Sequence, residues 1–159
     1  MVQITVISIG TLKESYLKDA VDEYKKRLSQ YARVEEINLK EEAIRNEDDR
    51  SEIARALSAE GVKILSSIPK DSYKIAMCVE GREYDSPALA RLIGDAADQK
   101  GRITFIIGSS HGLAEEVKRE CDARLSLSKL TFPHQLMRVI LAESVYRCMN
   151  IIKGTKYHK

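Results

Sequence analysis

Apolar residues along the chain form short strand-like runs that alternate with longer segments of helical spacing. The strand-like runs cover residues 3–9, 34–39, 73–79, 103–107 and 124–127. Apolar positions recur at intervals of three and four over residues 12–28, 51–68, 86–101, 113–121 and 133–152. Strands that alternate with helices predict a single α/β domain over residues 1–159, with a mostly parallel sheet flanked by helices.

Turn and cap residues set the expected ends of these elements. Gly10 stops the first strand, Pro69 ends the second helix, and Glu80-Gly81 stops the third strand. Ser86-Pro87 fits the N-cap and N1 positions of the third helix. Segment 40–49 is charged and has no apolar period, so we expect a loop there.

The last helix carries a broad apolar stripe that fits the core, a dimer seam, or both. Its members are Leu136, Ile140, Leu141, Val145, Cys148, Met149 and Ile152.

Composition excludes a membrane-spanning protein. The chain has 159 residues, of which 43% are hydrophobic and 31% are charged. No apolar run approaches the ~18 residues that a membrane span needs. Nothing at the amino terminus resembles a signal peptide, so the expected location is cytoplasmic.

Cysteine and histidine spacing argues against a metal site. Cys78, Cys121 and Cys148 never form C-x-x-C, and no two of the three histidines are spaced i, i+4. The expected metal content is therefore none.

Charge alone does not indicate nucleic acid, since the net charge is only +2. The first predicted helix carries Lys13, Lys18, Lys25, Lys26 and Arg27. These cations fit a solvated face or, alternatively, a stripe that follows a phosphate backbone.

Two loops at predicted strand ends are the candidate ligand site. Residues 124–136 read R-L-S-L-S-K-L-T-F-P-H-Q-L, a strand, a loop and a helix start, and Gly108-Ser109-Ser110-His111-Gly112 follows the most apolar strand. In a parallel sheet, ligands bind at such loops. The glycines also fit simple turn and cap roles.

Known catalytic motifs are missing. The chain has no G-x-G-x-x-G after its first strand, no P-loop, no H-E-x-x-H and no Ser-His-Asp order. A reaction that depends mainly on positioning remains compatible with the sequence. Methyl transfer from a sulfonium is one, because its positive charge disperses as the methyl group moves.

Four stretches carry a family resemblance. They read I-I-G-S-S-H-G-L (106–113), L-S-L-S-K-L-T-F-P-H-Q-L-M-R-V-I-L-A-E (125–143), V-Y-R (145–147) and a terminal Y-H-K. Together with I-G-T-L-K-E (9–14) and Y-K-K-R-L (24–28), they resemble the ribosomal RNA large subunit methyltransferase H family. That family usually has two glycines where this chain has Gly108-Ser109, which leaves the role of Ser109 open.

The resemblance implies a SPOUT fold with a carboxyl-terminal trefoil knot, working as a homodimer. It also implies methyl transfer from S-adenosylmethionine to N3 of a pseudouridine in 23S rRNA, which we expect to take place on the assembled ribosome. The implied cofactor-binding residues are Met77, Gly108, Leu127, Ser128, Lys129, Leu130, Thr131 and Phe132.

Several polar residues are candidates for the reaction itself. With the resemblance, Tyr157 and His158 are expected to reach the partner subunit's site, where His158 orients the base or removes its N3 proton. Arg138 is a further catalytic candidate that fits either a carboxylate or an RNA phosphate, and Gln135 fits a base edge or a solvated position. For His134 we expect a local hydrogen bond at the helix start.

Two rival functions remain open at this point. One is a non-catalytic nucleotide-binding or ribosome-associated module with the same fold. The other is a tRNA methyltransferase of that fold, which differs only in its acceptor.

Overall fold

A five-stranded sheet forms the centre of the computed structural model, which describes residues 1–159. The strands are β1 (Val2–Ile9), β2 (Ala32–Leu39), β3 (Tyr73–Glu83), β4 (Arg102–Ile107) and β5 (Ala123–Ser126). Their order in the sheet is β2-β1-β4-β3-β5, and every pairing is parallel. The predicted α/β class with a parallel sheet is confirmed.

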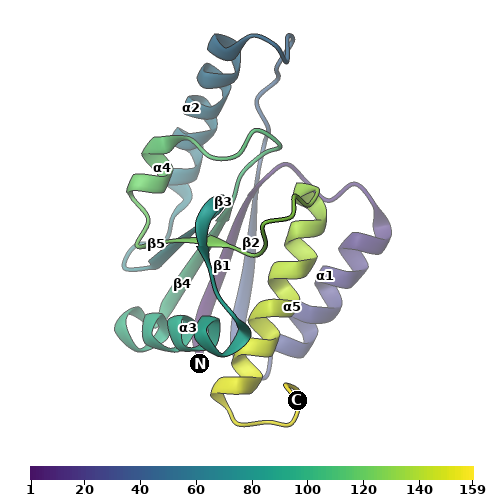
Figure 1. Ribbon diagram of the computed structural model, residues 1–159, viewed down its shortest axis with the longest axis vertical. Helices are drawn as coiled ribbons and strands as arrows, with labels where there is room; N and C mark the ends of the chain where they lie inside the picture. The colour runs from purple at the N-terminus through teal and green to yellow at the C-terminus, as the bar shows by residue number, and fades with distance from the viewer.

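Helices cover both faces of this sheet (Figure 1). They are α1 (Ser15–Leu28), α2 (Arg50–Ser67), α3 (Ser86–Lys100), α4 (Glu115–Arg119) and α5 (His134–Ile152). Helices α1, α3 and α5 pack on one face in the larger core, whereas α2 and α4 pack on the other in a smaller one. None of the helices is long and apolar enough to cross a membrane.

Strand β4 shows why the most apolar run occupies the middle of the sheet. Ile103, Phe105 and Ile107 enter the larger core and Ile106 enters the smaller one, each with at most 4% of its surface exposed. Alternate residues of a strand face opposite sides, so a strand covered on both faces must be apolar throughout.

Strand β3 runs past the expected stop at Glu80-Gly81. Its register with β5 shifts between Met77 and Arg82, which is the signature of a bulge. A Cβ on Gly81 would lie 2.6 Å from the backbone carbonyl carbon of Leu125. Gly81 therefore permits close contact between the two strands instead of ending one of them.

Side-chain caps define the starts of two helices. Asp49 accepts hydrogen bonds from the backbone N–H groups of Ser51 and Glu52, and Asp85 accepts one from Ala88. The sequence analysis named Ser86 as the cap of the third helix, but the carboxylate one residue earlier is the better placed acceptor.

Segment 40–49 is a loop, as predicted, and α2 holds it in place. The backbone N–H of Glu42 donates to Glu60 Oε2 at 3.0 Å, and the backbone N–H of Arg45 donates to Glu52 Oε1 at 2.6 Å. Lys63 Nζ donates to the carbonyl of Lys40 at 2.9 Å. Side chains from one face of α2 thus satisfy the loop's backbone.

The apolar stripe of α5 serves mainly the internal core. Leu141, Val145, Cys148 and Met149 are each at most 5% exposed. By contrast, Leu136 is 36% exposed and Ile152 is 41% exposed. Only the two ends of the stripe are left as open apolar surface.

A candidate active site at the carboxyl ends of the strands

A cavity of about 640 Å³ lies at the carboxyl ends of β3, β4 and β5. This volume falls within the range of small-molecule sites. Its walls come from residues 77–80, 107–113, 125–128 and 130–134, with Lys118 and Met137. Three segments that are far apart in the sequence meet here because their strands are neighbours in the sheet.

The loop after β4 can close only because position 108 is glycine. A Cβ on Gly108 would lie 2.2 Å from the carbonyl oxygen of Gly112. Gly112 itself has φ +86°, a conformation that L side chains rarely adopt. Its N–H donates to the carbonyl of Ser109 at 2.9 Å. The loop therefore folds back on itself beside the cavity.

The loop between β5 and α5 leaves most of its backbone donors free. The Ser126 hydroxyl donates to the carbonyl of Ser128 at 2.9 Å, and the N–H of Leu130 donates to Ser128 Oγ at 3.0 Å. The other N–H groups of this loop make no hydrogen bond to the protein; they belong to Leu127, Ser128, Lys129, Thr131 and Phe132. Such groups can recognise the polar edge of a ligand while apolar side chains cover its faces.

Polar groups occupy one side of the cavity. Lys118 forms an ion pair with Glu80, and the hydrogen bond with Lys118 lowers the pKa of this carboxyl. Burial raises the pKa of the neighbouring Cys78 thiol. On the loop after β4, His111 Nε2 lies 2.6 Å from Glu47 Oε2 of segment 40–49. The cavity thus combines apolar walls with a few fixed charges.

Most of the residues expected to bind a cofactor line this cavity. They are Met77, Gly108, Leu127, Ser128, Leu130, Thr131 and Phe132. Lys129 is exposed and does not line it. The role of each residue toward a ligand stays a prediction, but the structure brings seven of the eight to one place.

Gln135 and Arg138 lie outside the cavity. Gln135 Oε1 accepts from the backbone N–H of Lys13 at 3.0 Å, which ties α5 to the loop before α1. Arg138 is 6% exposed, and its Nη2 donates to Asn38 Oδ1 at 2.7 Å and lies 3.3 Å from Glu36 Oε1. Of the two partners predicted for Arg138, the structure shows the carboxylate. A catalytic role for Arg138 stays a prediction.

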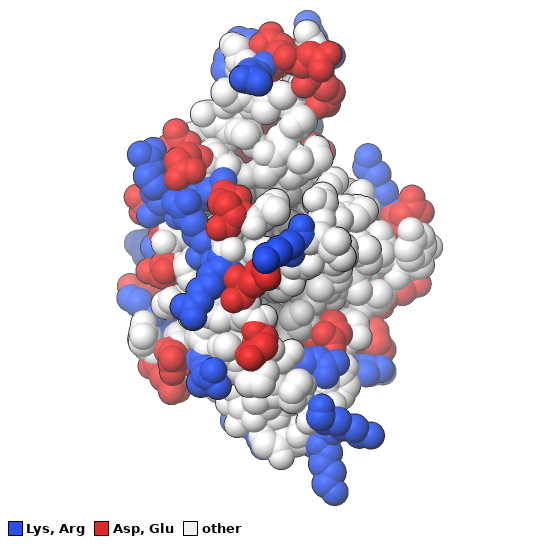
Figure 2. All heavy atoms as spheres, viewed as in Figure 1, with Lys and Arg blue, Asp and Glu red and all other residues white.

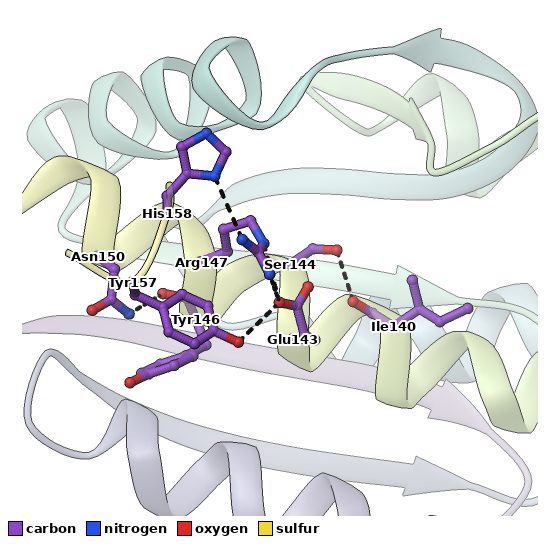
Figure 3. A network of polar contacts seen from close by, with 8 residues as sticks. All are labelled: Ile140, Glu143, Ser144, Tyr146, Arg147, Asn150, Tyr157 and His158. Atoms are coloured by element: carbon purple, nitrogen blue, oxygen red, sulfur yellow. Dashed lines mark hydrogen bonds and ion pairs between the residues drawn. The ribbon is translucent and has the colours of Figure 1, made fainter. Parts of the chain in front are cut away.

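Tyr157 and His158 lie beside Glu143 and Arg147 of α5 (Figure 3), and neither lines the cavity. The Tyr157 hydroxyl donates to Glu143 Oε1 at 3.2 Å, and its ring meets the Tyr146 ring edge-on at 4.7 Å between centroids. Arg147 lies over the Tyr157 ring, and His158 Nδ1 is 3.5 Å from Arg147 Nη1. The tail is thus folded back along its own helix.

Sequence reasoning missed several residues of the cavity wall. His134 makes no side-chain hydrogen bond at the start of α5 and instead lines the cavity, so the expected local bond is wrong. Lys118 and Cys78 were not singled out either. Cys78 could have been selected because it lies near the end of a predicted strand. No local sequence feature distinguishes Lys118, which lies on a five-residue helix.

Comparison with known proteins places this geometry in a family. Residues 2–158 match the family described as predicted SPOUT methyltransferase. The ribosomal RNA large subunit methyltransferase H of Caldicellulosiruptor bescii is 47% identical over 98% of this chain and 99% of its own. The protein of that name from Shouchella clausii is 43% identical over the same shares, and a putative one from Methanococcus maripaludis is 45% identical.

A solved structure supports the fold independently of close sequence similarity. A probable methylase family protein from Haemophilus influenzae superposes with a TM-score of 0.54 at 15% identity, over 98% of this chain and 70% of that one. The parallel sheet, the cavity at its strand ends and the near full-length relatives agree. The chain belongs to the ribosomal RNA large subunit methyltransferase H family and has the SPOUT methyltransferase fold.

Proposed function

We propose that this protein is an S-adenosylmethionine-dependent methyltransferase that methylates N3 of a pseudouridine in 23S rRNA on the assembled ribosome. The observation that carries the proposal is the loop between β5 and α5. Its free backbone N–H groups and its apolar side chains share one wall of a cavity of about 640 Å³. Membership of a family whose relatives are named for rRNA methylation gives the acceptor class.

The residues present fit the cofactor. An adenine needs backbone donors and acceptors along its edge and apolar cover on its faces. Loop 127–132 offers the former, and Met77, Leu127 and Phe132 offer the latter. When bound, S-adenosylmethionine supplies a methyl group on a positively charged sulfonium sulfur.

The cavity itself favours methyl transfer over chemistry by an activated nucleophile. The only thiol in its wall, Cys78, has a raised pKa because it is buried, so it is not a thiolate at neutral pH. In a largely apolar cavity, holding the acceptor nitrogen in line with the methyl group supplies much of the acceleration. Buried apolar wall residues such as Met77 and Leu113 also exclude water from that line.

The carboxyl-terminal tail is proposed to complete the site of a partner subunit. His134 lines the cavity at the start of α5, and the Tyr157 hydroxyl is held by Glu143 in the middle of this helix. Neither Tyr157 nor His158 lines the cavity of its own chain. This supports a homodimer in which Tyr157 stacks on the base in the partner subunit's site and His158 accepts its N3 proton.

The charge distribution fits an acceptor recognised by shape. Net charge is +2, and in Figure 2 cations and anions are interspersed around a broad uncharged area. Because a weak electrostatic footprint gives little affinity for naked RNA, an assembled ribosomal surface is the better partner.

The test is transfer of labelled methyl from S-adenosylmethionine to assembled ribosomes, free 23S rRNA and bulk tRNA, followed by mapping of the labelled nucleotide. Label on a 23S pseudouridine in the ribosome sample alone is the expected result. Label on tRNA would show that tRNA is the acceptor instead. If the cofactor bound but no RNA was labelled, the protein would be a non-catalytic binding module.

A further inference from the structure

Glu60 is a buried carboxyl outside the cavity that the proposed chemistry does not use. It lies on α2 with 3% of its surface exposed, and burial raises its pKa. Its Oε2 accepts from the backbone N–H of Glu42 at 3.0 Å, and a hydrogen bond with the Ser109 side chain partly offsets the rise in pKa. Burying a carboxyl is costly unless it is hydrogen-bonded, so these two partners explain how Glu60 is tolerated.

Ser109 connects this carboxyl to the cavity. The residue is 7% exposed and belongs to the loop after β4 that lines the cavity. Its Oγ also lies 3.4 Å from the backbone N–H of His111, and its carbonyl accepts from Gly112. The side chain that lowers the pKa of Glu60 therefore takes part in the loop's own hydrogen bonds.

A second contact holds the same loop from segment 40–49. His111 lines the cavity, and its Nε2 is 2.6 Å from Glu47 Oε2. Segment 40–49 is in turn fixed to α2, since Glu52 accepts from the N–H groups of Arg45 and Asn46 at 2.6 and 3.2 Å. Glu52 and Glu60 of α2 thus hold segment 40–49, and Glu47 of this segment holds the cavity loop at His111.

We propose that Glu60 and Glu47 are positioning residues that hold the 108–112 loop in the conformation that binds the cofactor. Neither lines the cavity, so Glu47 acts through His111, and Glu60 acts through segment 40–49, which carries Glu47. A loop that already has its bound conformation loses less conformational entropy when the ligand binds. The inference rests on the proposed function only in naming S-adenosylmethionine as that ligand.

The conservative variant Glu60→Gln is a control for the role of Glu60. In Glu60→Gln the amide oxygen still accepts from the N–H of Glu42, so the connection is kept without the ionisable group. Glu60→Ala removes it. Asp48 lies in the same segment with an exposed side chain that makes no hydrogen bond or ion pair, which makes Asp48→Ala the matched control.

The experiment measures S-adenosylmethionine affinity by calorimetry, and hydrogen–deuterium exchange of the 108–113 peptide in the ligand-free protein. Glu60→Ala, Ser109→Ala and Glu47→Ala are each expected to weaken affinity by about ten-fold and to speed exchange of that peptide. The Glu60→Ala/Glu47→Ala double variant should be no weaker than the weaker single one, because both residues act through segment 40–49. Glu60→Gln and Asp48→Ala should behave as wild type.

The two readouts separate failure of this inference from failure of the proposed function. The positioning role is wrong if the wild type binds S-adenosylmethionine and all three alanine variants keep the wild-type affinity and the wild-type exchange of the 108–113 peptide. This conclusion holds even if their melting temperatures fall. Absence of binding in the wild type would overturn the choice of cofactor, while faster exchange in the variants would still show that Glu60 and Glu47 support the loop.

Discussion

The hydroxyl of Tyr157 donates to Glu143 Oε1 at 3.2 Å, which attaches the last residues of the chain to the middle of α5 (Figure 3). The same carboxylate also accepts from Arg147 Nη2 at 2.7 Å. The tail therefore has a defined position that does not depend on a partner, and a role in a second subunit requires it to leave this position or to carry α5 with it.

Removing the ring at Tyr157 tests the tail's role. Tyr157→Phe keeps the contacts with Tyr146 and Arg147 and loses only the hydroxyl, so we expect stability to change by less than about 1 kcal/mol. Tyr157→Ala is expected to lower single-turnover methylation of ribosomes at least about ten-fold, because base stacking on the ring is lost. Cofactor affinity, measured by calorimetry, should be unchanged in both.

His158→Ala is the companion variant, since it retains the tail's attachment through Tyr157. Unchanged single-turnover methylation on saturating ribosomes would eliminate His158 as proton acceptor. His134, which lines the cavity of the same chain, would then be the next histidine to substitute.

Acid should weaken the contact between α5 and β2. Burial tends to raise the pKa of Glu36, but hydrogen bonds with Lys25 and Arg138 lower it further, so the net shift is downward. A carboxyl with a lowered pKa stabilises the folded state above its unfolded pKa, and this contribution is lost as pH falls through the folded value. We expect the melting temperature to fall below about pH 4.3.

Glu36→Gln should flatten that acid-dependent fall, as followed by thermal melts between pH 3 and 7. Arg138→Met is expected to cost about 1–3 kcal/mol at neutral pH, since it leaves Glu36 with Lys25 alone. Loss of methylation by Arg138→Met in a fully folded protein with normal cofactor affinity would support the expected catalytic role of Arg138.

Glycine 108 should tolerate no side chain. In Gly108→Ala the added Cβ meets the backbone of Gly112, so the loop must move and we expect cofactor binding to be lost. Gly94→Ala is the matched control on α3, because its Cβ would lie 3.8 Å from the nearest side-chain atom. There alanine should stabilise the protein by about 0.5–1 kcal/mol, measured by urea unfolding. Normal binding by Gly108→Ala would show that the loop is not part of the site.

Thiol reactivity should report on the cavity. Burial raises the pKa of Cys148 to about 12 and that of Cys121 to about 11, so neither is expected to react with iodoacetamide at pH 8. Cys78 lines the cavity and should be the one thiol that reacts, slowly, because its pKa is also raised. S-adenosylmethionine should protect it, as followed by mass spectrometry. Labelling of Cys148 before Cys78 would contradict this assignment.

Local pattern was sufficient for much of the fold because strands and helices differ in the period of their apolar positions. All ten elements appear where the periodicity predicts them. The errors lie at ends and bulges. Gly81 was predicted to end β3, but in the sheet it allows the strand to pass close to Leu125. Whether a glycine ends a strand or lets another strand approach depends on its neighbours in space.

The candidate site, like the fold, could be predicted from the sequence only in part. The chain order of glycine and serine loops at strand ends was enough to select the loops at 108–112 and 124–136, because parallel strands present their carboxyl ends together. The individual cofactor-binding residues came from the family resemblance. The surroundings of Arg138 and His134 could not be predicted, since a residue's position on a helix does not reveal which element lies opposite. Only the packing of α5 on β2 turns Arg138 toward Glu36 and leaves His134 beside the cavity.

Local periodicity and turn chemistry were enough to predict the alternation of strands and helices, the parallel sheet and the two loops that line the cavity. Packing in three dimensions sets which distant groups meet: Glu60 with the backbone N–H of Glu42, Glu47 with His111, and Tyr157 with Glu143. Those contacts join residues 14 to 64 positions apart, and they form only when the sheet order and helix packing bring the residues together.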